Sequence, residues 1–135
     1  AAAGEPGTRV RLVHGIFPGV ELAVGQYDAV ISNSLLHHLH QPQVMWSAVR
    51  KLGRAGASVL IMDLKRTRDE EHAREIVATY AGNEPEVLQV DFYNSLLAAF
   101  TPSEIKLQLE EAGLDGLSVV EVSDRHLIVT GRLAL

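Results

Sequence analysis

The chain has 135 residues with 47% hydrophobic and 21% charged side chains, and its formal net charge is −5. This length and composition are typical of one globular domain with a single core. The acidic balance argues against nucleic acid as a partner. The absence of cysteine excludes disulfides, thiolate nucleophiles and cysteine-ligated metals. No apolar run approaches membrane-spanning length and no signal peptide is visible, so we expect a cytoplasmic protein that does not bind a membrane.

The first quarter of the chain predicts one strand and one loop. Residues 9–14 alternate at first between charged and apolar side chains, which is typical of a strand with one solvent-facing side. Residues 15–25 contain three glycines and Pro18 and predict a loop.

The stretch from residue 27 to residue 40 changes character halfway along. Residues 27–32 include a short run rich in β-branched side chains, which predicts a strand buried on both faces. Polar residues 32–34 follow, and leucines at helical spacing come next. Ligands of open α/β sheets bind at the carboxyl ends of parallel strands, so we expect a functional site here.

The centre of the chain predicts a helix and a second buried strand. Pro42 suits the first turn of a helix, and Gly53 is expected to end that helix as a left-handed cap. Residues 58–62 predict the strand, with Asp63 at its carboxyl end.

Two further helices are expected next. Thr67 and Glu70 have the spacing of a capping box, and the helix that follows should end at Gly82. Pro85 opens another helical stretch that reaches about Ala99.

The last third of the chain holds the clearest start signal. Residues 101–104, TPSE, predict a capping box with proline at the first helical position, and Gly113 should end that helix. Two strands, 117–122 and 126–131, are joined by 123–125 and predict a hairpin. The alternation of strands and helices predicts a parallel α/β sheet with one late antiparallel strand.

Three segments resemble the class I S-adenosylmethionine-dependent methyltransferases. Residues 27–39, YDAVISNSLLHHL, resemble the family's fourth strand and the turn after it. Residues 49–57 resemble the R-x-L-k-P-G-G turn before the fifth strand, with Ala55 in place of proline and Ala57 in place of the second glycine. Residues 100–114 resemble the helix before the closing hairpin.

This resemblance implies an α/β fold with a Rossmann-like, mostly parallel methyltransferase sheet and a C-terminal antiparallel hairpin strand. Residues 1–135 would then form a single, N-terminally incomplete domain in which 9–14 is the family's third strand. The first two strand–helix units, roughly 60 residues at about 30 per unit, would be missing. No G-x-G sequence is present, and Ile16 stands where the family commonly has an acid near the adenine.

An incomplete sheet of this kind leaves a gap with unpaired strand edges. We consider three ways of resolving it. The sequence is a fragment, residues 9–14 move into the vacant position, or a second copy fills the gap in a homodimer.

The resemblance assigns five residues to the cofactor S-adenosyl-L-methionine. They are Gly15, Ile16, Phe17, Asn33 and Ser34. The amide of Asn33 is able to serve both the carboxylate and the ammonium of the methionine end. The alternative is that Asn33 caps the helix after it.

Three histidines, His37, His38 and His40, allow a catalytic, a metal-binding or a structural interpretation. We expect His37 and His38 to include the base that takes a proton from an acceptor hydroxyl. His37 and His40 could share a helix face, but no acid lies among them to complete a metal site, so we predict no metal. A buried structural histidine remains the alternative.

Other polar and aromatic residues have two interpretations each. Asp63 either orients an acceptor or is an exposed turn acid, and Asp28, at the opposite end of its strand, is expected to be structural. Four aromatic residues either line an acceptor pocket or belong to the core: Phe17, Tyr80, Phe92 and Tyr93.

The function expected from the resemblance is methyl transfer from S-adenosyl-L-methionine to a small molecule. Such a transfer depends mainly on alignment of the two reacting groups. The alternative is a non-catalytic, truncated methyltransferase-like module for binding or dimerisation, favoured by the missing glycine loop and by Ile16. A nicotinamide-dependent oxidoreductase is disfavoured because its phosphate-binding glycines are also absent.

Overall fold

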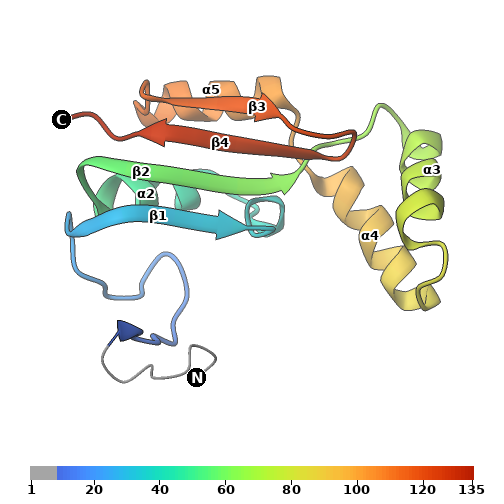
Figure 1. Cartoon of the computed structure of the whole chain (residues 1–135), viewed down its shortest axis with the longest axis horizontal. Coiled ribbons are helices and arrows are strands. Elements are labelled where there is room, and N and C mark those ends of the chain that lie inside the picture. Colours follow the sequence, from blue (N-terminus) through green and yellow to red (C-terminus); the bar gives the residue numbers. More distant parts are fainter. Residues whose placement is uncertain (1–8) are drawn as a thin grey trace.

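Four strands form one mixed sheet in the computed structural model, which describes residues 9–135 (Figure 1). β1 (Tyr27–Asn33) pairs in parallel with β2 (Gly53–Leu64). β4 (His126–Arg132) pairs antiparallel with β2 and with β3 (Leu117–Glu121), giving the order β1-β2-β4-β3. The terminal hairpin is therefore confirmed, whereas only one of the three pairings is parallel, so the expectation of a mostly parallel sheet is not met.

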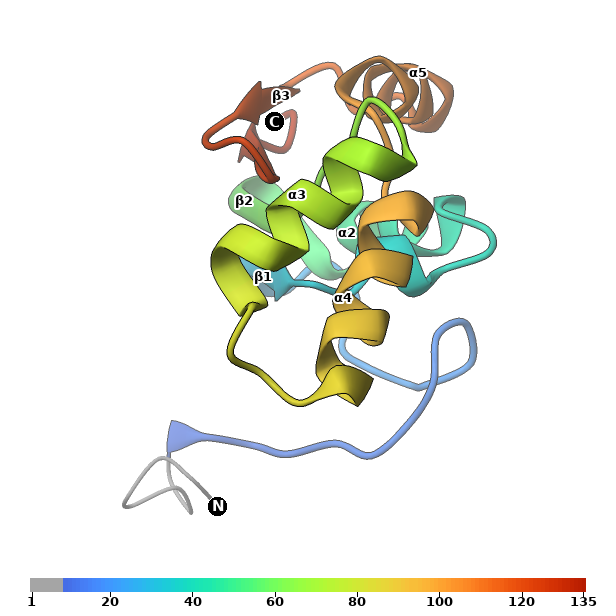
Figure 2. The same ribbon diagram turned by 90° about the vertical axis from the view of Figure 1, so that its right-hand side faces the viewer.

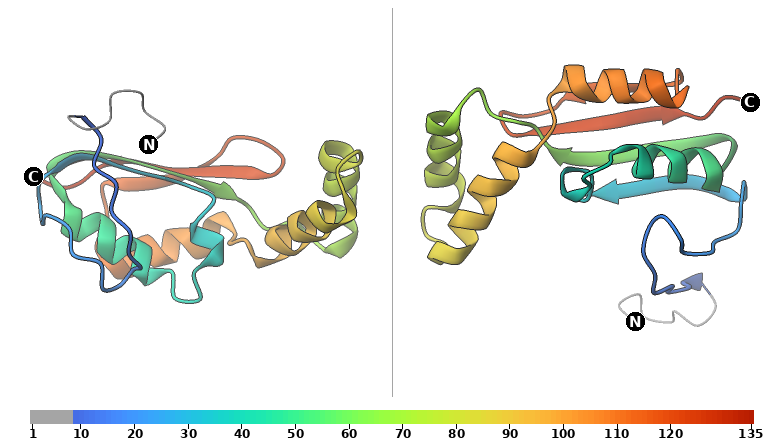
Figure 3. Two further views of the ribbon diagram at one scale, coloured as in Figure 1. Left: turned by 90° about the horizontal axis from the view of Figure 1, so that it is seen from below. Right: turned by 180° about the vertical axis from the view of Figure 1, so that it is seen from behind.

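In the described part of the chain, helices cover one face of this sheet and leave the other without a helix (Figure 3). α2 (Gln43–Leu52) and α5 (Pro102–Ala112) lie on that face, and Trp46 Nε1 donates to Gln108 Oε1 at 2.9 Å between them. The main core fills the space between these helices and the sheet. The opposite face is open to solvent, as the 45% exposure of Leu60 on this face shows.

A helical hairpin stands beyond the carboxyl ends of β1 and β2 (Figures 1 and 2). It consists of α3 (Glu70–Ala81) and α4 (Glu86–Ala98), and it has a small core of its own. The Tyr80 hydroxyl donates to Asp124 Oδ2 at 2.8 Å, which ties α3 to the turn between β3 and β4. Tyr80 is exposed, so it does not belong to the core, which was one of its two interpretations.

The helix caps follow local sequence signals with two exceptions. The capping box of α5 at Thr101 is present, and Gly113 ends this helix with a φ of 69°. The N-cap of α3 is Asp69, which accepts from His72 N, and not Thr67. Gly53 has a φ of −69° and begins β2 instead of forming a left-handed cap. A Cβ at this position would require the end of the Leu133 side chain to move.

β1 is an edge strand and is not buried on both faces as the sequence predicted. Ala29 is exposed and Ile31 is 76% exposed, because no helix covers this side of the strand. Residues 9–14 form no strand and are exposed, since they pair with no other segment of the described chain. Among the described residues, no helix is long and apolar enough to cross a membrane.

Candidate functional site

The carboxyl end of β1 carries a strained residue. Asn33 ends the strand with an exposed side chain, and Ser34 follows with a φ of 59°. Ser34 N donates to Met62 O at 2.9 Å, which fixes this backbone against β2. A left-handed conformation is costly for a residue other than glycine and is found preferentially at functional sites.

Asn33 does not cap the short 3-10 helix η1 (Leu36–His38), as one interpretation expected. The N-cap of η1 is Leu35, and it makes no side-chain capping hydrogen bond. The Asn33 Oδ1 atom instead accepts from Ser34 Oγ at 3.2 Å. The amide of Asn33 therefore faces solvent at the carboxyl edge of the parallel pair.

His37 and Asp63 form a buried pair below this edge. Asp63 Oδ2 accepts from His37 N at 2.7 Å, and Asp63 Oδ1 lies 2.6 Å from His37 Nδ1. The side chains are 4% and 2% exposed. Asp63 is therefore not the exposed turn acid of one interpretation. It joins η1 to the end of β2.

The remaining ring nitrogen of His37 has no partner. In the neutral ring with its proton on Nδ1, where it is donated to Asp63, Nε2 is an acceptor. Nε2 is buried and makes no hydrogen bond within the described part of the chain. A buried polar atom of this kind is rare in folded proteins and calls for an explanation.

His38 and His40 are placed differently from His37. Both are exposed, and the His38 ring centroid lies 4.0 Å from that of His37. His37 and His40 do not share a helix face, because η1 ends at His38. Within residues 9–135, no three His, Asp or Glu side chains are grouped so that they could hold a metal ion.

The three predicted cofactor residues of the first loop lie beside β1 and not at its carboxyl end. Gly15, Ile16 and Phe17 line a groove of about 1080 Å³ together with residues 29–32 of β1 and part of α2. Asn33 and Ser34 are not part of its lining. The predicted cofactor residues therefore form two groups. Gly15, Ile16 and Phe17 line the groove beside β1, and Asn33 and Ser34 lie at the carboxyl end of this strand.

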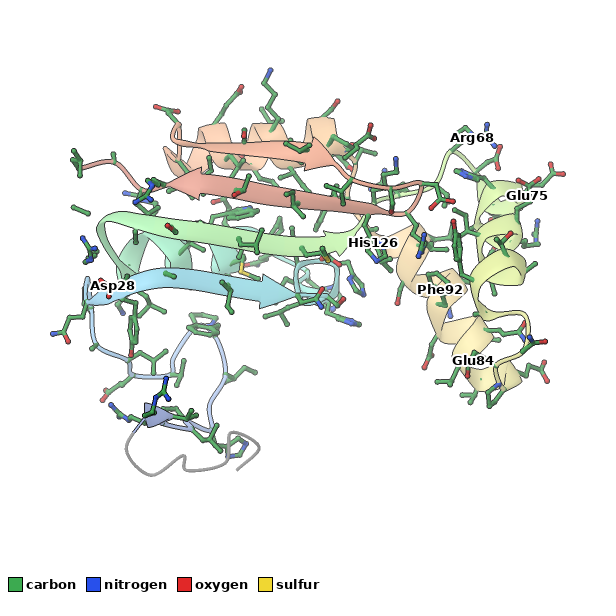
Figure 4. The ribbon with its side chains drawn as sticks, viewed as in Figure 1. Asp28, Arg68, Glu75, Glu84, Phe92 and His126 are labelled. Carbon is green, nitrogen blue, oxygen red and sulfur yellow. The ribbon has the colours of Figure 1, made fainter. Side chains whose placement is uncertain are left out.

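The four aromatic residues do not form one acceptor pocket. Phe17 lines the groove beside β1, whereas Phe92 and Tyr93 pack against the core of the α3–α4 hairpin. Figure 4 shows Phe92 on α4, far from Asp28 at the start of β1. Asp28 pairs with Arg54 at the surface, and its structural role stays a prediction.

His126 is a further polar residue near the carboxyl end of β2. It begins β4 opposite Leu64. Partial burial and the charge of Arg125 lower the pKa of His126, while Asp124 and Asp63 act in the opposite direction. No local pattern indicated this histidine, because only the antiparallel return of β4 brings it to this edge.

Comparisons with known proteins show the fold. No protein-family model and no curated protein matches the sequence. A SAM-dependent methyltransferase from Aquifex aeolicus matches the structure with a TM-score of 0.63 and 17% identity, over 92% of this chain and 55% of that chain. An arsenic(III) S-adenosylmethionine methyltransferase from Chlamydomonas reinhardtii matches with a TM-score of 0.49 and 17% identity, over 83% and 38% of the two chains.

The first of these matches identifies an α/β fold similar to that of a SAM-dependent methyltransferase. This chain spans only 55% of the length of that enzyme.

Proposed function

We propose that this chain is a methyltransferase-like domain that binds S-adenosyl-L-methionine and transfers its methyl group to a small molecule. The observation that carries the proposal is the end of β1, where strained Ser34 follows the exposed amide of Asn33. In open α/β sheets ligands bind at this edge.

The side chains at the edge suit the polar end of the cofactor. The Asn33 amide has both donor and acceptor atoms, as an amino-acid group with an ammonium and a carboxylate requires. S-adenosyl-L-methionine would supply a methyl group on a good leaving group, so the task of the protein is mainly to align it. The apolar groove along Gly15, Ile16 and Phe17 suits a less polar part of a ligand.

The two histidines have different roles in this proposal. His38 exposes its ring at the edge and is the candidate to take a proton from an acceptor. His37 is a positioning residue, since its ring packs against His38 and is held by Asp63. An acceptor cannot reach the buried Nε2 of His37 in this conformation.

The second candidate function is a non-catalytic binding or dimerisation module. It is supported by the absence of any G-x-G sequence and by Ile16 in the place of the family's acid. In such a module the edge of β1 would keep its shape without binding the cofactor.

Calorimetric titration with S-adenosyl-L-methionine and with S-adenosylhomocysteine separates the two functions. We expect micromolar binding, and we expect Asn33→Ala to bind roughly tenfold more weakly, a loss of about 1.4 kcal/mol, because hydrogen bonds to a charged ligand group are removed. Asn83→Ala, in the exposed turn between α3 and α4, is the matched control and should bind normally. Absence of binding at millimolar ligand would refute the methyltransferase proposal for this chain.

A further inference from the structure

The Nε2 atom of His37 is placed to accept a hydrogen bond that no described residue supplies. The Nδ1 side of the ring faces Asp63 Oδ1 at 2.6 Å, and Asp63 Oδ2 accepts from His37 N at 2.7 Å. These contacts fix the ring and favour a proton on Nδ1, so Nε2 of the neutral ring is an acceptor. Nε2 is buried, and a buried acceptor without a donor is unfavourable. A donor group of a ligand would satisfy it.

Access to Nε2 depends on where helix α4 lies. The end of β2 and helix α4 are the main elements packed against η1. The two nitrogens of an imidazole ring point in nearly opposite directions, and Nδ1 of His37 points to Asp63 on β2. Nε2 therefore points away from Asp63, and α4 is the other main element beside η1. Figure 2 shows the α3–α4 hairpin in front of this end of the sheet.

The α3–α4 hairpin joins the sheet through two short segments that lie side by side. Residues 65–69 lead into α3 and residues 99–101 follow α4, and together we call them the stem. A bridge pairs Lys65 with Phe100, and Arg66 N donates to Phe100 O at 3.2 Å. The hairpin has its own small core between its two helices. It is therefore able to turn about the stem as one unit without losing that core.

Away from the stem, surface contacts join α3 to the turn between β3 and β4. The Tyr80 hydroxyl donates to Asp124 Oδ2 at 2.8 Å, and Arg125 Cζ lies 3.5 Å from the centroid of the Tyr80 ring. We call these three residues the latch. Tyr80 is 47% exposed, and polar contacts at the surface contribute little free energy. From the sheet, Leu64 also packs against the hairpin core. A weak latch and a small apolar contact thus hold the hairpin closed.

We propose that the α3–α4 hairpin opens by turning about its stem, and that an O–H or N–H group of a ligand then donates to His37 Nε2. The inference rests on the proposed function, because this group would belong to the methyl acceptor. In the closed conformation His37 positions His38, and in the open conformation it also contacts the acceptor. A fixed acceptor atom selects for a ligand with a donor, because a ligand without one leaves Nε2 unpaired. His37 is thus a specificity-determining residue.

Diethyl pyrocarbonate, which acylates unprotonated imidazole nitrogens, tests the opening in the full chain. Tandem mass spectrometry reads the products at His37, His38 and His40 separately. We expect the two exposed histidines to react fast and His37 slowly. Tyr80→Phe removes the latch hydroxyl and should speed the reaction of His37 about threefold, as expected for the loss of one exposed hydrogen bond. Tyr93→Phe removes the same group from α4 outside the latch and should leave the rate unchanged.

A cross-link across the latch makes the opposite change. The chain has no cysteine, so Tyr80→Cys combined with Asp124→Cys provides a single pair for a short bis-maleimide linker. Cross-linking should suppress the reaction of His37 and leave that of His38 unchanged. Equal rates at His37 with and without the cross-link, or an unchanged rate in Tyr80→Phe, would overturn the opening. Faster amide exchange throughout β4 in Tyr80→Phe would also overturn it, since His37 would then react through global unfolding.

Phenol and toluene, which have nearly the same size and differ in one hydroxyl group, test the need for a donor. Long-range proton–nitrogen NMR spectra of Tyr80→Phe report the Nε2 resonance of His37. We expect phenol at millimolar concentration to shift this resonance and toluene to leave it in place. Equal shifts, or no shift, would refute the role of Nε2 as an acceptor for ligands. None of these measurements uses S-adenosyl-L-methionine, so failure of this inference is distinguishable from failure of the cofactor titration.

Discussion

Asp63 joins the two segments that meet at the carboxyl edge of the parallel pair. Besides its two contacts with His37, Asp63 Oδ1 accepts from Leu64 N at 2.7 Å. Three donors on one buried carboxylate hold η1, and with it the neighbouring His38, against the end of β2. A buried group that is satisfied in this way is costly to disturb, because its partners would lose their hydrogen bonds away from water.

We expect Asp63→Asn to lower the free energy of unfolding by about 3 kcal/mol, since the amide group places a donor against the donors that surround it. Denaturant titration measures this change. Asp28→Asn is the control, because the Asp28 side chain is 80% exposed and its ion pair lies at the surface, and it should change stability by less than about 0.5 kcal/mol. Equal effects of the two substitutions would show that the buried pair does not hold the edge together.

Helix α5 begins with a reciprocal cap that also makes it sensitive to pH. Thr101 N donates to Glu104 Oε1 at 2.9 Å, and Glu104 pairs with Arg66 at 2.8 Å. Partial burial acts to raise the pKa of Glu104, but the hydrogen bond from Thr101 and the charge of Arg66 outweigh it and lower this pKa below the ordinary 4.5. A lowered carboxyl pKa stabilises the fold above the ordinary value, and this contribution is lost as the pH falls through the lowered value.

We therefore expect the wild-type chain to be more stable than Glu104→Gln near neutral pH, and this advantage to disappear as the solution is acidified below pH 4.5 toward the lowered pKa. Denaturant titrations of both chains across this range measure the difference. Glu110→Gln, an exposed site on the same helix, is the matched control and should show a smaller dependence on pH. A stability difference for Glu104→Gln that does not change with pH would contradict the expectation.

The molecule as a whole has two separate hydrophobic cores. The larger core lies between the sheet and helices α2 and α5, and the smaller one lies between α3 and α4. Leu96 is fully buried in the small core, and Leu127 of β4 is fully buried in the large one. A unit with a small core of its own is able to open locally while the rest of the fold stays intact.

We expect Leu96→Ala, which typically costs about 2–5 kcal/mol at a buried site, to speed amide exchange in α3 and α4 while β2 and β4 change little. Leu127→Ala makes the same chemical change in the large core and should speed exchange in every element through global unfolding. Hydrogen-exchange mass spectrometry measures both patterns. Equal acceleration of β2 and β4 by Leu96→Ala would show that the two cores unfold together.

Local patterns predicted the elements whose signals lie within a few residues of one another. The capping box at Thr101, the left-handed Gly113 and the closing hairpin were all expected and are all present. Signals that depend on distant partners were less reliable. Gly53 was expected to be a left-handed cap because glycine commonly ends helices, but it has a φ of −69° and begins β2, where Leu133, 80 residues later in the chain, packs close to it.

The role of the β1 edge as a functional site stays a prediction, and the sequence indicated only part of its structure. The polar residues after an apolar strand marked the carboxyl end of β1 at Asn33 and Ser34. The sequence by itself determined the α/β class and the order of the main helices and strands from residue 27 onward, whereas the strand expected at residues 9–14 is absent. Only the tertiary structure decided that Asp63 is buried against His37, that Ser34 is strained and that β1 is left as an open edge. The physical reason is that burial and pairing depend on which neighbours arrive in space, and 26 residues separate His37 from its partner.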